Sequence, residues 1–189
     1  MKNLIFGIVI STLLIAACNN TSSKETSQNS SGEDSTGVKS SEVSGSTSSI
    51  ESILDPYFKV KNALTDDNDN VAAEAGKDLV KALESFDKGS LTAEQSKVFT
   101  DIREDAKEHA KHIADNAGNI KHQREHFETL SEEIYELAKS AGGKKLYYTN
   151  CPMYNNNKGA NWVSEVKEIR NPYLGKEMLE CGTVKEELN

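Results

Sequence analysis

The chain has 189 residues, with 30 acidic against 22 basic side chains and a formal net charge of −8 at pH 7. Nucleic-acid binding draws much of its free energy from neutralising phosphates, so this acidic balance, which includes no basic stripe, argues against nucleic acid as a partner. The same charge disfavours adsorption on an anionic lipid surface.

The N-terminus has the pattern of a bacterial lipoprotein leader. Lys2 gives a positive start and residues 4–17 form an apolar run that ends in small residues. The run is shorter than the roughly 20 residues that a membrane-spanning helix needs. The sequence LIAAC, which ends at Cys18, resembles a lipobox, in which the cysteine is lipidated. We therefore predict that residues 1–17 are a signal peptide and that Cys18 carries a lipid; ordinary secretory cleavage is the alternative.

The segment after Cys18 is typical of a tether. Residues 18–49 are rich in Ser and Thr and contain almost no apolar side chains, so they cannot bury enough surface to offset the entropy of ordering. A flexible chain of about 30 residues spans roughly 30 Å. We expect a protein of the bacterial cell envelope whose membrane partner is reached through the lipid. The residues after Cys18 do not themselves set the membrane face, and we take the periplasmic face of the outer membrane as the expected location.

Residues 50–189 form one domain's length of chain and begin with four helical patterns. The first covers about residues 52–64, with Pro56 in its first turn, where proline is tolerated. The second follows residues 66–70. The third opens with a Thr92–Gln95 capping box and stops at Gly118, and the fourth runs from about Asn119 to Gly142-Gly143. The predicted inward residues include Leu54, Tyr57, Val71, Leu79, Phe99, Ile113, Phe127 and Leu137. Short connections favour a mainly α fold, a small antiparallel helical bundle.

From about residue 144 the helical periodicity ends. Residues 145–149 predict a short strand, residues 155–159 and the Asn171-Pro172 pair predict turns, and a Met178–Gly182 cluster follows. We expect residues 144–189 to form a C-terminal cap of irregular and short β structure, with a hairpin, laid against the bundle.

Sulfur is concentrated in this cap. The four sulfur residues that remain after Met1 and Cys18 fall into two clusters, Cys151-Pro152-Met153 and Met178-Leu179-Glu180-Cys181. Thiolate and thioether groups are soft ligands that favour Cu(I) over magnesium or calcium. The alternative is a Cys151–Cys181 disulfide, which is common in exported proteins and would stabilise the fold by about 3–4 kcal/mol. Sulfur placement alone leaves both open.

The histidines suggest a second group of ligands. His109 and His112 lie on one flank of the third helical stripe, and His122 and His126 lie on the flank of the same sense in the fourth. In an antiparallel pair these flanks face each other. Counted from the turn at Gly118, His109 and His126 are nearly level, so we rank them as the best metal ligands among the four. A packed or solvated histidine is the alternative for each.

Three longer stretches carry a family resemblance. The runs QREHFETLSEEIYELAK, LYYTNCPM and KGANWVSEVKEIRNPYLGKEMLECGTVKE resemble a domain-of-unknown-function family of bacterial envelope lipoproteins, also found at the C-terminal end of periplasmic adaptor subunits of heavy-metal efflux pumps. The resemblance implies copper handling through Cys151, Met153, Met178 and Cys181. Asn150 stands where members of the family often have histidine, and this chain lacks the adaptor portion.

These patterns together indicate a non-enzymatic protein. We expect a lipid-anchored protein that binds Cu(I) or a similar soft ion, for buffering or hand-over to efflux or copper-handling proteins. The alternative is an envelope interaction module in which the Cys151–Cys181 disulfide is structural. No Ser-His-Asp arrangement, phosphate loop or activated cysteine nucleophile is indicated.

Overall fold

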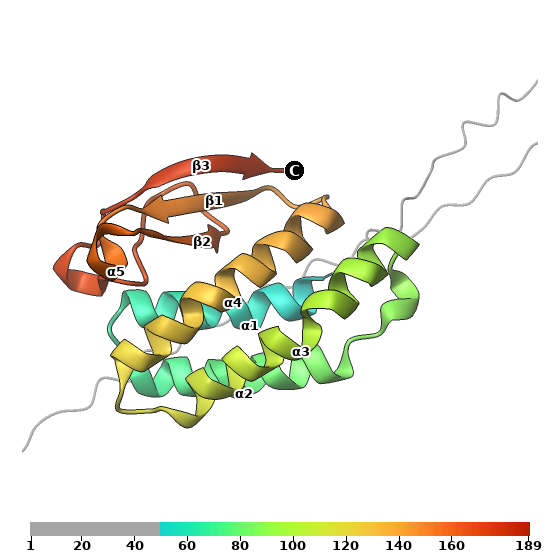
Figure 1. Ribbon diagram of the computed structural model, residues 1–189, viewed down its shortest axis with the longest axis horizontal. Helices are drawn as coiled ribbons and strands as arrows, with labels where there is room; N and C mark the ends of the chain where they lie inside the picture. The colour runs from blue at the N-terminus through green and yellow to red at the C-terminus, as the bar shows by residue number, and fades with distance from the viewer. Residues whose placement is uncertain (1–49) are drawn as a thin grey trace, which may run out of the picture. The chain divides into compact units, whose positions relative to one another are not determined.

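The computed structural model describes residues 50–189, which are mainly helical with a small C-terminal sheet (Figure 1). This confirms the predicted helical bundle with a short β cap. The predicted signal peptide, the tether and the lipidation site at Cys18 lie outside the described residues. None of the helices in the described part of the chain combines the length and the apolar character needed to cross a bilayer.

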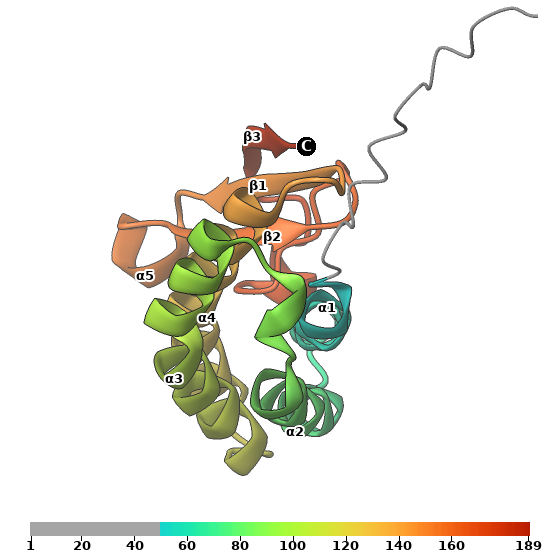
Figure 2. The same ribbon diagram turned by 90° about the vertical axis from the view of Figure 1, so that its right-hand side faces the viewer.

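Four helices make up the bundle: α1 (Glu51–Thr65), α2 (Asp69–Ser85), α3 (Ala93–Asp115) and α4 (Ile120–Ala141). Each packs mainly on its neighbours in the chain, α1 on α2, α2 on α3 and α3 on α4 (Figure 2). The predicted capping box of Thr92 and Gln95 opens α3, and the Asn119 side chain caps α4 by accepting a hydrogen bond from the His122 backbone. These caps explain why the starts of α3 and α4 could be predicted from the sequence.

The cap is a three-stranded antiparallel sheet of order β2-β1-β3. Its strands are β1 (Leu146–Cys151), β2 (Ala160–Ser164) and β3 (Thr183–Leu188). The hairpin of β1 and β2 matches the expectation, and its connection contains the short helix α5 (Tyr154–Asn157). The third strand was not predicted, because its residues alternate weakly and are mostly charged or exposed.

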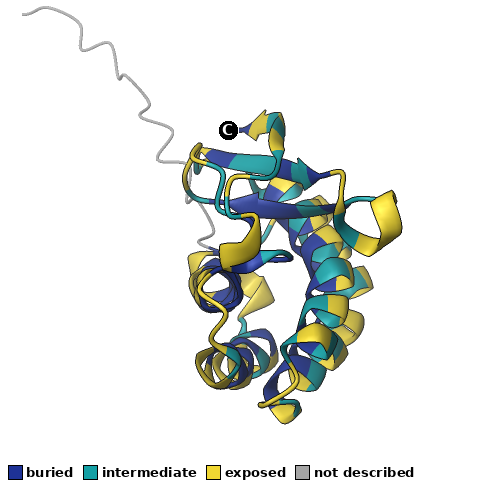
Figure 3. Cartoon of the chain, turned by 90° about the vertical axis from the view of Figure 1, so that its left-hand side faces the viewer, coloured by how far each residue is buried: buried dark blue, intermediate teal, exposed yellow. Residues whose placement is uncertain are grey.

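The sheet lies across α1 and α4, so that its inner face completes the core (Figures 1 and 2). Tyr57 of α1 is fully buried at this junction, where its ring stacks on Phe127 of α4 at a centroid distance of 5.3 Å. Its hydroxyl accepts a hydrogen bond from the Val163 backbone of β2 and pairs with the Ser131 hydroxyl of α4. Figure 3 shows the buried residues along the inward sides of the helices and the sheet.

Two details of the helix predictions were wrong. Val71 is 50% exposed, because α2 begins at Asp69 and its buried face starts one residue later, at Ala72. Pro56 lies in the second turn of α1, since that helix already begins at Glu51. Proline cannot donate the backbone hydrogen bond that an interior position normally makes, so α1 lacks one bond there.

Candidate metal-binding residues

The sheet and the turn before β3 bring the two cysteines together. Cys151 is the last residue of β1 and is buried, whereas Cys181 precedes β3 and is half-buried. Their Sγ atoms are 3.1 Å apart, although 30 positions separate them in the chain. The sequence prediction that these residues meet is therefore matched by the geometry.

Asn171 holds the turn that carries Cys181. Its buried side chain donates to the Cys181 carbonyl at 2.7 Å and accepts from the backbone N–H groups of Tyr173 and Leu174. Its own N–H donates to the Leu179 carbonyl at 2.8 Å. The sequence indicated only a turn at this position, because the long-range bond to Cys181 leaves no local signal.

The two methionines lie at the surface beside this pair. Met153 is 49% exposed, and its backbone forms a hydrogen bond with the Cys181 thiol. Met178 is 36% exposed and lines a shallow depression together with Glu177, Glu180 and Cys181. Burial, followed by the neighbouring Cys151, raises the pKa of the Cys181 thiol, and the bond from Met153 opposes this. The thiol therefore keeps its proton at neutral pH, and a metal ion would have to displace it.

All four histidines gather between α3 and α4. His109 Nδ1 is 2.9 Å from His126 Nδ1, and His126 Nε2 is 3.2 Å from His122 Nε2. The His112 ring stacks on the His126 ring with centroids 4.1 Å apart. The expected level pairing of His109 with His126 is thus present in the structure.

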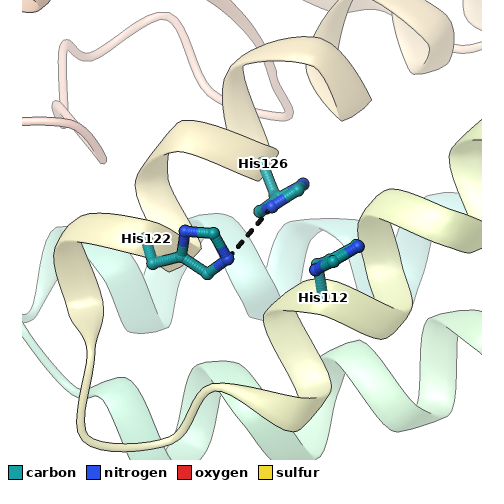
Figure 4. Close-up of side chains that lie close together, drawn as sticks. All are labelled: His112, His122 and His126. Atoms are coloured by element: carbon teal, nitrogen blue, oxygen red, sulfur yellow. Dashed lines mark hydrogen bonds between the residues drawn. The ribbon is translucent and has the colours of Figure 1, made fainter.

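Three of these histidines can serve one ion. His112, His122 and His126 each offer a ring nitrogen, and the three nitrogens lie within 4.8 Å of one another (Figure 4). His109 is not a member of this group of three. It lies on the other side of His126, toward Glu133.

The surroundings of His126, whose ring lies between those of the other histidines, keep it uncharged. Burial, together with the charges of the other three histidines, lowers the pKa of His126 to about 4, and burial lowers the pKa of His109. A neutral imidazole has a free lone pair, which is the form that binds a metal.

Glu133 is an acidic residue that was not predicted from the sequence to belong to a metal site. Burial, reinforced by the charge of Asp105, raises the pKa of its carboxyl to about 8. Its Oε1 is 4.0 Å from His109 Nε2, and its buried Oε2 has no hydrogen-bond partner among the described residues. The one feature of the sequence that could have indicated Glu133 is its spacing of seven residues from His126, which places both side chains on one face of α4.

The six predicted metal ligands thus fall into two groups on different elements. Cys151, Cys181 and the two methionines belong to the cap, whereas His126 and His109 belong to the bundle. None of the contacts found among residues 50–189 joins the thiols to the imidazoles. The predicted ligands therefore do not form one common site among the described residues.

The comparisons with known proteins identify one domain. Residues 53–145 match the family described as "Protein of unknown function (DUF3347)". This stretch covers the bundle with its four histidines and ends before β1, so it excludes both cysteines of the cap. Neither the curated proteins nor the solved structures include a significant match to the chain.

Proposed function

We propose that the protein is a lipid-anchored protein of the cell envelope that binds Cu(I), or a comparably soft ion, through the C-terminal cap. Cys151 and Cys181 would supply thiolates, and Met153 and Met178 would supply thioethers. The observation that carries the proposal is the approach of the two Sγ atoms to 3.1 Å, beside a methionine whose backbone contacts one of them. The role that we propose for the protein is metal binding rather than catalysis.

The chemistry of these side chains suits a soft monovalent ion. Thiolates bind Cu(I) strongly, and neutral thioethers add soft ligands without further charge. Cys151 is buried while Cys181 reaches the surface, so an ion can enter from the side of Cys181 and end between the two sulfurs.

Exposed methionines also favour release to a second protein. Met153 and Met178 are the two exposed sulfur side chains of the cap, where an incoming ligand can replace them one at a time. We propose that the ion is buffered here or handed to an efflux or copper-handling partner. A tether between the lipid and the domain would give the cap the reach to meet such a partner.

An anaerobic Cu(I) titration against a chromophoric competitor tests this function. The reduced full chain carrying Cys18→Ser should bind one equivalent, and the further Cys151→Ser, Cys181→Ser changes should weaken binding by at least ~100-fold, about 2.7 kcal/mol. Met153→Ala should weaken it less, and Val166→Ala, which truncates another exposed apolar side chain of the cap, should leave it unchanged. Equal affinity in the parent and the double cysteine variant would refute the proposal.

A structural disulfide is the second candidate, because the same close approach of the sulfurs favours it. The protein would then be an envelope interaction module. The disulfide alternative predicts that the Cys18→Ser chain, isolated without reductant, contains no free thiol. It also predicts that reduction lowers the free energy of unfolding by about 3–4 kcal/mol. Two reactive thiols in the protein as isolated would exclude this alternative.

A further inference from the structure

The histidine group has the dimensions of a coordination site. Zn–N bonds are about 2.0–2.1 Å long, so two nitrogens on one tetrahedral ion are about 3.3 Å apart. The distance of 3.2 Å between His122 Nε2 and His126 Nε2 matches that separation. One ion can bind both rings with little movement of either helix.

His112 completes a group of three from the opposite helix. Its side chain is 43% exposed, and its ring nitrogen lies within 4.8 Å of the other two ligand atoms (Figure 4). Because the side chain is open to solvent on one side, it can turn toward an ion held by the α4 pair. Three protein nitrogens leave a fourth position for water or an exchanging ligand.

Partners on the outer nitrogens orient the rings. His122 Nδ1 is 3.3 Å from Glu125 Oε2, which leaves Nε2 free for the ion. The second nitrogen of His126 pairs with His109, and His109 Nε2 is in turn 4.0 Å from Glu133. Metal-bound histidines usually have such a partner on the other ring nitrogen, which fixes the tautomer and the ring direction.

From this geometry we propose that His112, His122 and His126 bind one borderline divalent ion of the Zn(II) or Cu(II) class. His109 and Glu133 are positioning residues that act through His126. The site differs from the sulfur pair in its ligands, in the ion that it prefers and in the elements that build it. It does not depend on the Cu(I) function of the cap.

The ligand set decides the class of ion. Imidazole nitrogens suit zinc, copper and nickel, whereas magnesium and calcium prefer oxygen and Cu(I) prefers the sulfur ligands of the cap. Neutral histidines add no negative charge, so a hard cation gains little here. By the usual order of divalent affinities, Cu(II) should bind more tightly than Zn(II).

Zn²⁺ is the better probe, because it has no redox chemistry of its own. It is titrated calorimetrically into the full chain carrying Cys18→Ser, Cys151→Ser and Cys181→Ser, which removes every thiolate. We expect one equivalent to bind and to raise Tm. His122→Gln and His126→Gln should each weaken binding at least ~10-fold, as expected for the loss of one ligand. The matched control is Lys121→Gln, an exposed neighbour on the same helix.

His109→Gln tests the positioning role. It should weaken Zn²⁺ binding about 10-fold while leaving both the stoichiometry and the Tm of the metal-free chain unchanged, which a purely structural residue would not do. A second readout uses Co²⁺ and the reduced chain with Cys151 and Cys181 intact. Histidine ligation should give d–d absorption bands that His126→Gln weakens, whereas Co²⁺ bound to the thiolates of the cap would give bands that this variant leaves unchanged.

The results separate the two proposals. Zn²⁺ affinity that is unchanged in His122→Gln and His126→Gln would mean binding to surface carboxylates and would overturn the site. So would a folded cysteine-free chain that binds no Zn²⁺, or a Co²⁺ spectrum that His126→Gln leaves unaltered. Loss of Cu(I) binding at the cap changes none of these outcomes.

Discussion

Lys61 is a fully buried lysine of α1, and its charge is balanced by one partner. Its Nζ donates to Glu165 Oε2 at 2.5 Å and to the Ser164 hydroxyl at 3.3 Å. Burial lowers the pKa of Lys61, and the bond to Glu165 opposes that shift. The pair ties α1 to the end of β2, so it belongs to the same junction as Tyr57.

Truncating this lysine should therefore be costly. Lys61→Ala leaves a cavity and an unpaired carboxylate, and we expect it to lower the free energy of unfolding by about 3 kcal/mol. Lys61→Met fills the same space with an apolar side chain and should cost less. Urea denaturation at pH 7 measures both, with the exposed Lys59→Ala on the same helix as control. Equal losses in Lys61→Ala and Lys59→Ala would show that the pair contributes nothing.

At the scale of elements, α2 and α3 approach each other closely at Gly76. A Cβ placed on Gly76 would lie 3.0 Å from the Ala110 carbonyl oxygen and 3.0 Å from the Ala114 nitrogen. Both are backbone atoms of α3, which cannot turn aside as a side chain can. The small residues Gly76, Ala110 and Ala114 thus set the distance between the two helices.

A larger side chain at Gly76 should push these helices apart. We expect Gly76→Val to lower the free energy of unfolding by about 2–3 kcal/mol through overpacking, as measured by urea denaturation. Because α3 carries His109 and His112, the same change should also weaken Zn²⁺ binding. Val71→Ala, at an exposed position of α2, is the control. A Gly76→Val chain as stable as the parent would show that the bundle absorbs the extra volume.

The helices were predictable because their signals are local. The side chains of Thr92, Gln95 and Asn119 each cap a helix by bonding a backbone group only three residues away in the chain. The apolar residues of each helix also recur with the period of an α-helix. The pairing of His109 with His126 also followed from counting outward from a short turn. Val71 shows the limit of this approach, since the buried face of α2 starts one residue later than predicted and leaves Val71 at the surface.

The cap and the details of the sites depend on contacts between distant residues. β3 pairs with β1 through a register shift at Tyr148 and Thr149 that nothing in its charged sequence indicates. Asn171 positions Cys181 through a tertiary hydrogen bond. Glu133 is distinguished from other acidic residues only by the burial of its carboxyl, which the fold produces. Such features follow from packing rather than from local pattern.

At the scale of the whole described domain, the bundle and the cap are joined by Arg124 of α4. Its guanidinium donates to the Pro172 carbonyl in the cap, to the Leu64 carbonyl at the end of α1, and to Asp67 at 2.6 Å. Burial alone would raise the pKa of Asp67, but the hydrogen bonds from Arg124 and the Lys176 backbone, together with the charges of both residues, lower it. The bundle with its histidines and the cap with its sulfurs therefore belong to one compact unit, which carries both candidate metal sites.

Copper-edge X-ray absorption can identify the atoms that bind Cu(I), which we propose to be the sulfur atoms of the cap. The sample is the reduced Cys18→Ser chain loaded anaerobically with one equivalent of Cu(I). We expect a first shell of sulfur at about 2.3 Å, the length of a metal–thiolate bond. A first shell of nitrogen at about 2.0 Å would instead place the ion on the histidines and refute Cu(I) binding by the cap.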